Sequence, residues 1–172
     1  MIVVDIDRCL GCKSCELACG VEHSESKELH KAIVEYPTPA SRVKVEASED
    51  LSIPLACRQC EDAPCVKVCP TKALERTSQE EPVLINSELC IGCKWCILVC
   101  PFGVIRMDKT GKAILKCDMC FKRLLLGKIP SCVLACPTKA LQFKSLDEVT
   151  AEKRKDYLTK FIKDGKYINE TG

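Results

Sequence analysis

The chain has 172 residues, of which 16 are Cys and only 5% are aromatic. This length supports one domain or two small ones with a modest core, and a cysteine share of about 9% indicates that cross-links or metal ions supply part of the stability. The formal net charge of +2 and the shortage of aromatic residues argue against a zinc-based nucleic-acid-binding protein.

The N-terminus has neither the basic start nor the apolar core of a signal peptide: it reads MIVVDIDR. The longest apolar stretch, Ile97 to Ile105, is too short to span a membrane. We therefore expect a cytoplasmic protein, peripheral to a membrane complex at most and not inserted in the membrane. A reducing compartment disfavours stable disulfides, so the cysteines are expected to bind metal.

The cysteines form four runs of four. Two runs have the spacing C-x2-C-x2-C-x3-C, namely Cys9, Cys12, Cys15, Cys19 and Cys90, Cys93, Cys96, Cys100. In such a run three thiolates converge on one 4Fe-4S cluster, and the fourth points to a second cluster. The other two runs have a wider second gap: Cys57, Cys60, Cys65, Cys69 and Cys117, Cys120, Cys132, Cys136. Zinc sites use separated C-x2-C pairs and would leave cysteines over, so the sequence predicts four 4Fe-4S clusters.

Internal repeats support this grouping. CPTKAL occurs at residues 69–74 and again at 136–141, and VDIDRCLGC (4–12) aligns with INSELCIGC (85–93). Each repeat predicts a short strand that leads into a ferredoxin-like cluster loop, and the Pro after three of the runs is expected to start a helical turn. Alternating apolar residues predict another strand at residues 42–47, with Val43 and Val45 on one face.

Two histidines and the C-terminal segment lie outside the cysteine runs. His23 and His30 are expected to be ordinary polar residues, because the thiolates already complete four sites. Ser145 and Glu148 form a capping box before a helix that is expected to reach about Lys163. This helix is expected to pack over the core, and a helix that docks a partner is the alternative.

No catalytic motif accompanies the cysteines. The sequence has no Gly-rich phosphate loop and no Ser-His-Asp set, and a radical-forming enzyme would need a run short of one Cys. We therefore expect an electron-transfer subunit of an oxidoreductase system without its own catalytic site.

The segments CLGCKSCELACGVEHSESK and CRQCEDAPCVKVCPTKAL resemble the four-cluster iron-sulfur subunits of DMSO reductase, formate hydrogenlyase and related enzymes. EHSESK and PTPASRVKVEA most resemble the CooF-type partner of nickel carbon monoxide dehydrogenase. The resemblance covers about Ile2 to Lys144. Gly20 departs from the Pro usual after the first run, and the presence of Cys93 argues against the 3Fe-4S variant of some members.

The resemblance implies an α+β fold of two dicluster ferredoxin-like units, one inserted in the other, held by their clusters. The first unit would comprise residues 1–56 and 108–144, the inserted unit residues 57–107, and the helical tail residues 145–172. The implied ligand sets are Cys9, Cys12, Cys15, Cys136; Cys117, Cys120, Cys132, Cys19; Cys57, Cys60, Cys65, Cys100; and Cys90, Cys93, Cys96, Cys69. The spacing alone leaves open a tandem arrangement, in which the first run pairs with the second and the third with the fourth.

The resemblance also implies a function: single electrons pass through the clusters from carbon monoxide dehydrogenase to a hydrogenase or other acceptor. A formate hydrogenlyase or molybdopterin oxidoreductase is the alternative partner. Four oxidised clusters would add about 8 negative charges and bring the net charge to roughly −6. Basic residues beside the ligands are expected to offset this charge locally: Arg8, Lys13, Arg58, Lys67, Lys94, Lys116 and Arg123.

Overall fold

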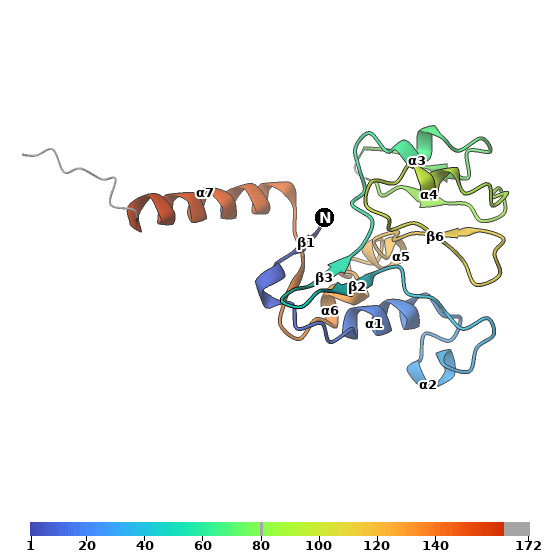
Figure 1. Cartoon of the computed structure of the whole chain (residues 1–172), viewed down its shortest axis with the longest axis horizontal. Coiled ribbons are helices and arrows are strands. Elements are labelled where there is room, and N and C mark those ends of the chain that lie inside the picture. The colour runs from blue at the N-terminus through green and yellow to red at the C-terminus, as the bar shows by residue number, and fades with distance from the viewer. Residues whose placement is uncertain (80, 164–172) are drawn as a thin grey trace, which may run out of the picture.

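The computed structural model describes residues 1–79 and 81–163. In this part of the chain the strands form four two-stranded antiparallel sheets, and short helices lie between them (Figure 1). The fold is therefore a mixture of helix and strand, as expected. Residues 164–172 of the expected C-terminal segment lie outside the described residues.

The segments at the beginning and the end of the cysteine-rich region pack together. Strand β1 (Ile2–Val4) pairs with β8 (Leu141–Phe143), so the strand expected before the first cysteine run is confirmed. Helix α1 (Ser14–Glu22) packs against α6 (Ser131–Leu134). The first and last cysteine runs consequently lie side by side.

A second hairpin covers this part. Strand β2 (Lys44–Ala47) pairs with β3 (Ser52–Leu55), which confirms the strand predicted at residues 42–47. Val43 and Val45 are buried, as their alternation predicts. The first core consists of these valines with residues that come from both ends of the chain, among them Val133 and Leu141.

The middle of the chain repeats this plan around its own core. That core contains Leu74, Val83, Ile105 and Ile114. Its elements are α3 (Pro64–Lys67), β4 (Leu74–Glu75), β5 (Leu84–Ile85), α4 (Trp95–Leu98), β6 (Arg106–Met107) and β7 (Ile114–Leu115). Strand β4 pairs with β5, and β6 pairs with β7. The β6–β7 hairpin therefore crosses residues 107 and 108, where the inserted unit was expected to end.

Three of the cysteine runs end in Cys-Pro, and the helix before each pair is short. Helices α3, α4 and α6 stop two residues before their Cys-Pro pair, because proline disfavours helical geometry at the residue before it. Pro70, Pro101 and Pro137 then lie in single turns from which no helix continues. Gly20 imposes no such limit, and α1 continues through it to Glu22.

The remaining helices are α2 (Leu29–Ala32), α5 (Phe121–Leu124) and α7 (Leu146–Lys163), with a 3-10 turn at Ile6–Arg8. The capping box at the start of α7 is confirmed: the Glu148 amide donates to Ser145 Oγ at 3.2 Å, and the Ser145 amide donates to Glu148 Oε2 at 2.7 Å. The expectation that α7 packs over the core is wrong. The helix projects away from the body in Figure 1 and buries none of its residues. Most of its side chains are charged or polar, so it presents little apolar surface to pack on the core.

Candidate metal centres

The cysteines gather in four groups, which we name sites A to D. Site A comprises Cys9, Cys12, Cys15 and Cys136; site B comprises Cys19, Cys117, Cys120 and Cys132; site C comprises Cys57, Cys60, Cys65 and Cys100; site D comprises Cys69, Cys90, Cys93 and Cys96. Sites A, C and D each line a single cavity. The structure thus brings together cysteines that are far apart in the sequence.

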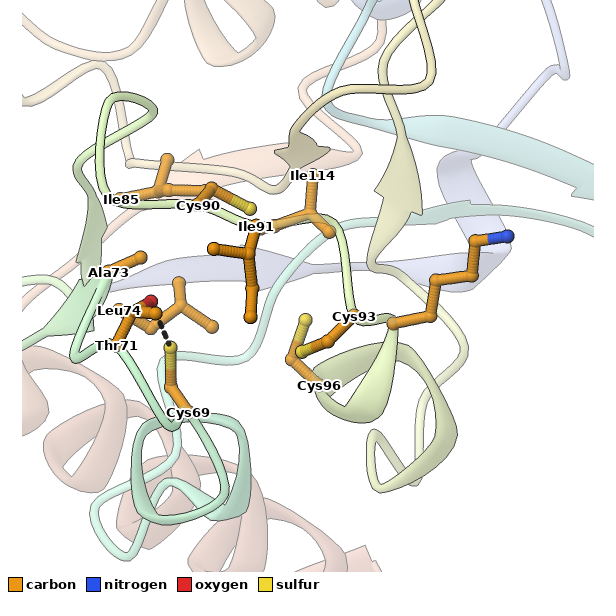
Figure 2. A pocket seen from close by; sticks show the side chains of 11 residues that line it. Cys69, Thr71, Ala73, Leu74, Ile85, Cys90, Ile91, Cys93, Cys96 and Ile114 are labelled. Carbon is orange, nitrogen blue, oxygen red and sulfur yellow. Dashed lines mark hydrogen bonds between the residues drawn. The ribbon is translucent and has the colours of Figure 1, made fainter.

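Sites A and D are built on matching loops. In site A the loop passes through Gly11 and Lys13, and in site D through Gly92 and Lys94, all four in the left-handed conformation. This backbone curls each loop so that its three cysteines face one space, and a helix begins directly after it. Figure 2 shows the cysteines of site D arranged around a cavity whose other lining side chains are mostly apolar, such as Leu74 and Ile114.

Site C lies in the same core as site D. Its cavity is lined by Ala63, Val83 and Ile105 as well as by the cysteines. The backbone amide of Gln59 donates to Cys57 Sγ at 3.5 Å. This amide is therefore placed to hydrogen-bond a cysteine ligand of site C.

Site B is the most enclosed of the four, because all of its cysteines are buried. Burial raises the pKa of the Cys132 thiol, and the neighbouring thiols of Cys117, Cys19 and Cys120 raise it further. Burial likewise raises the pKa of Cys117 to about 12. Thiols raised in this way, such as Cys117 and Cys132, ionise at neutral pH only when a positive charge compensates them, which is what bound iron would provide.

The same electrostatic contacts give the order of the sites. Cys15 of site A acts on the thiol of Cys132 in site B, and Cys57 of site C acts on Cys117 in site B. Cys65 of site C acts on Cys96 in site D. The sites therefore follow one another in the order A, B, C, D.

Exposure differs between the ends and the middle of this series. Of the cysteines, Cys12 in site A and Cys93 in site D are exposed, whereas those of sites B and C are buried or half-buried. Both exposed cysteines follow an exposed apolar residue and a glycine: Leu10 is 73% and Ile91 is 66% exposed. Each end of the series is thus open to solvent.

The residues present fit an iron-sulfur cluster at each site. Every site supplies four sulfurs, the cavities of sites A, C and D hold no competing carboxylate, and their walls are mainly apolar. Hydrogen-bond donors also reach several sulfurs: Leu141 N lies 3.5 Å from Cys136 Sγ, Met119 N lies 3.4 Å from Cys117 Sγ, and Thr71 Oγ1 lies 3.8 Å from Cys69 Sγ. Such donors stabilise thiolate ligands.

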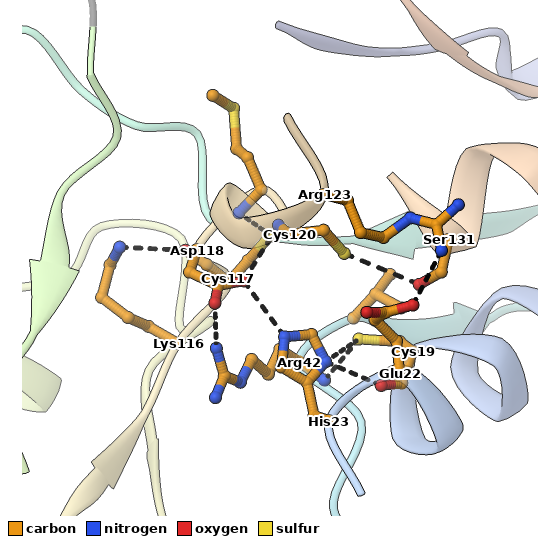
Figure 3. Close-up of polar contacts among 12 residues, drawn as sticks. Cys19, Glu22, His23, Arg42, Lys116, Cys117, Asp118, Cys120, Arg123 and Ser131 are labelled. Atoms are coloured by element: carbon orange, nitrogen blue, oxygen red, sulfur yellow. Dashed lines mark hydrogen bonds and ion pairs between the residues drawn. The ribbon is translucent and has the colours of Figure 1, made fainter. Parts of the chain in front are cut away.

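His23 makes contacts that the sequence did not predict (Figure 3). Its Nδ1 lies 2.7 Å from the carbonyl oxygen and 3.7 Å from Sγ of Cys19, and its Nε2 lies 3.1 Å from Asp118 Oδ1. Burial would lower the pKa of His23, but the hydrogen bonds to Asp118 and Cys19 outweigh it and raise the pKa to about 10. Arg42 also contacts Asp118, at 2.5 Å, and its backbone amide donates to Cys19 Sγ at 3.1 Å.

His23 therefore supports a site B cysteine and is more than an ordinary polar residue. The signal in the sequence was Gly20: without Pro at that position helix α1 continues, and a residue four positions after Cys19 lies beside it. His30 meets the expectation, because it is exposed and pairs only with Glu28 among the contacts described. His23, Asp118 and Cys120 also lie within 4.8 Å of one another, but the sulfur of Cys120 belongs to site B.

The basic residues expected to offset cluster charge divide into three kinds. Arg8 pairs with Asp5, Lys67 with Asp62, and Arg123 with Glu22. Lys13, Arg58 and Lys94 are exposed. Lys116 differs from all of these, because only 1% of it is exposed.

These features define an iron-sulfur protein with four cysteine quartets. The sequence matches the family described as 4Fe-4S dicluster domain over residues 49–146, and the chain belongs to that family. It is an iron-sulfur electron-transport protein whose cofactors are four 4Fe-4S clusters. No helix in residues 1–79 and 81–163 is long and apolar enough to cross a membrane.

Three relatives cover most of the chain. The "Iron-sulfur protein" of Rhodospirillum rubrum is 42% identical over 86% of this chain and 83% of its own. The "Electron transport protein HydN" of Escherichia coli (strain K12) is 37% identical over 90% of this chain and 94% of its own. The B subunit of the anaerobic dimethyl sulfoxide reductase of Haemophilus influenzae is 36% identical over 84% of this chain and 73% of its own. These names place the chain among electron-transport proteins, and they do not show the CooF-type partnership.

Proposed function

We propose that the protein passes single electrons along sites A, B, C and D between two redox enzymes and has no catalytic site of its own. A 4Fe-4S cluster supplies one-electron storage at each site. The observation that carries the proposal is the pattern of exposure: Cys12 and Cys93 are exposed at the two ends, while site B between them is buried. Such a series can exchange electrons at its two exposed ends, and its site B is shielded from solvent.

We assign the ligands as the four sites group them, which makes the two ends of the cysteine-rich region one unit around an inserted one, with the β6–β7 hairpin in the inserted unit. Support comes from the fourth cysteine of each run. Cys136 shares a cavity with Cys9, and Cys69 shares one with Cys90, although each lies far away in the sequence. A tandem arrangement would require Cys69 to leave the cavity of site D for that of site A.

The two ends offer similar surfaces to a partner. Leu10 and Ile91 each stand beside an exposed cysteine, and Trp95 adds a half-exposed ring near Cys93. Apolar contacts of this size suit a brief encounter, whose buried area would be below about 1,200 Å². We assign one partner to each end.

For the electron donor we propose a nickel carbon monoxide dehydrogenase, with a hydrogenase or other acceptor at the opposite end, all in the cytoplasm or at the surface of a membrane complex. The support is the sequence resemblance of EHSESK and PTPASRVKVEA. A molybdopterin oxidoreductase or formate hydrogenlyase is the second candidate, favoured by the 36% identity to the dimethyl sulfoxide reductase B subunit.

Anaerobic mixing with purified carbon monoxide dehydrogenase tests the donor. When CO is added to the mixture, reduction of the clusters should bleach the visible absorbance of this protein. Reduction by a formate- or molybdenum-dependent enzyme of the same cell, without bleaching under CO, would replace the dehydrogenase by the second candidate. Reduction by neither class would contradict the proposed role.

The same assay identifies the end that the donor uses. Leu10→Glu and Ile91→Glu each place a charge on one exposed end, and one of them should slow bleaching at least tenfold while the other leaves it unchanged. Val34→Glu is the matched control, since Val34 is 78% exposed and lines none of the cysteine cavities. Equal rates in all three variants would exclude both ends as docking surfaces.

A further inference from the structure

Lys116 is a buried basic residue that lies directly before Cys117. It is 1% exposed and is the largest of the fully buried side chains in the described part of the molecule. Its Nζ lies 2.5 Å from the carbonyl oxygen of Val83 and 3.0 Å from that of Cys117. Figure 3 shows this side chain extending from the loop of Cys117, away from His23 and Arg42.

These two carbonyl groups belong to different sites. Cys117 is part of site B, and Val83 lines the cavity of site C. Lys116 also lies close enough to Cys65 of site C for an electrostatic interaction between the two side chains. The ammonium group therefore lies at the junction between the two middle sites.

The protein part of this junction supplies no negative charge to Lys116. The ion pairs formed by residues 1–79 and 81–163 do not include it, and its two partners are neutral carbonyl groups. A buried ammonium without a counter-charge is strongly unfavourable. Clusters bound by thiolates carry net negative charge, so sites B and C, once filled, would supply what the polypeptide lacks.

We propose that Lys116 is the shared counter-charge of sites B and C and that it raises the reduction potentials of both, so that each of these two middle sites is reduced more readily. This inference rests on the proposed function. One electron moves from one site to the next, and the positive charge stays fixed, so no proton transfer and no bond formation is required. Lys116 acts as a positioning residue through its charge and does not ligate iron.

Gln59 provides a neutral comparison at the same place. Its Nε2 donates to the Cys117 carbonyl at 2.8 Å, and its Oε1 accepts from the Val83 amide at 2.9 Å. Gln59 thus joins the same two residues as Lys116 but carries no charge. Substitution of Gln59 loosens the junction and leaves its formal charge unchanged.

The experiment is an anaerobic redox titration of the iron-loaded full chain followed by EPR, with sites B and C assigned from Cys120→Ser and Cys60→Ser. In Lys116→Met we expect the reduction equilibria of sites B and C to shift toward the oxidised form at least tenfold, which is about 59 mV for a one-electron couple. Sites A and D should not shift. Lys116→Arg and the exposed control Lys109→Met should keep all four potentials, and Gln59→Leu should shift sites B and C less than Lys116→Met does.

The results separate charge from structure. Unchanged potentials in fully loaded Lys116→Met, or an equal shift in Gln59→Leu, would overturn the inference while leaving the electron-transport role intact. If Lys116→Met binds less iron at sites B and C but Lys116→Arg loads fully, the counter-charge is required and the inference holds. If Lys116→Arg loses the iron as well, the residue is structural and the inference fails.

Discussion

His23 Nε2 lies 3.1 Å from Asp118 Oδ1, and this contact joins two segments that are 95 residues apart. His23 follows helix α1, which carries Cys19, whereas Asp118 lies between Cys117 and Cys120. Asp118 Oδ1 also accepts from the Cys120 backbone amide at 3.0 Å. One ion pair therefore holds together the two chain segments that form site B.

The first prediction concerns this ion pair. His23→Leu should reduce the free energy of unfolding by about 1.5–3 kcal/mol, the range for hydrogen bonds to charged groups, because the half-buried Asp118 loses one of its partners. Loss of cluster absorbance in an anaerobic urea titration measures the change, and its midpoint should fall. His30→Leu is the matched control, since the His30 side chain is 77% exposed. Equal midpoints for the two variants would mean that the ion pair does not hold site B.

The second prediction concerns Gly20. Gly20→Pro gives the first run the Cys-Pro ending of the other three, so α1 should end before Cys19 and His23 should move away from site B. We expect a loss of about 3 kcal/mol or more in stability, from the helix break alone. The measurement is circular dichroism together with the urea midpoint.

Gly20→Ala is the control for this substitution. An added Cβ would meet Pro39 O and Ser41 N at 3.9 Å, which is ordinary van der Waals contact. Alanine is the better helix former, so Gly20→Ala should keep or raise the midpoint. A Gly20→Pro protein with the α1 helix and His23 contacts unchanged would contradict our explanation of the helix length.

The third prediction concerns the cysteines that begin the two CPTKAL segments, Cys69 and Cys136, and the cluster that each one binds. Cys136→Ser should perturb the cluster held with Cys9, Cys12 and Cys15, and Cys69→Ser should perturb the cluster held with Cys90, Cys93 and Cys96. A tandem arrangement predicts the opposite outcome for each variant. Site-resolved EPR, or a crystal structure of either loaded variant, distinguishes the two.

The fourth prediction concerns pH and helix α7. The hydrogen bonds from the backbone amide and hydroxyl of Ser145 lower the pKa of Glu148 below its usual value of 4.5. The cap therefore contributes fully above pH 4.5 and is lost as the pH falls through the lowered pKa. The protection of the amides of Asp147–Val149 against exchange, relative to their intrinsic rates at each pH, should fall over that acidic range, and Glu148→Gln should weaken the dependence. Exchange that is equally pH-dependent in Glu148→Gln would exclude the cap as its cause.

Much of the fold and the metal chemistry could be predicted because short-range patterns determine them. The spacing around Cys9 and Cys90 sets the loop geometry, and the alternation at Val43 and Val45 gives a strand with one buried face. A capping box such as that of Ser145 acts over three residues. These features depend on neighbours in the sequence.

Other features depend on contacts between distant segments. The partner of His23 is Asp118, and the partners of Lys116 are carbonyl groups of Val83 and Cys117, which spacing does not reveal. Helix α7 was expected to cover the core, but whether an exposed amphipathic helix packs on its own chain depends on a complementary surface. Nothing in the sequence around Lys116 distinguishes it from an exposed lysine, and only the tertiary structure shows that it is buried.

Anaerobic iron and acid-labile sulfide analysis of the fully loaded chain tests the central claim most directly. Four complete quartets predict about 16 iron atoms and as many sulfides per chain. Removal of this iron by a chelator should also collapse the secondary structure, because ligation contributes to folding in small metal-dependent domains. About eight iron atoms, or zinc in place of iron, would contradict a series of four 4Fe-4S clusters.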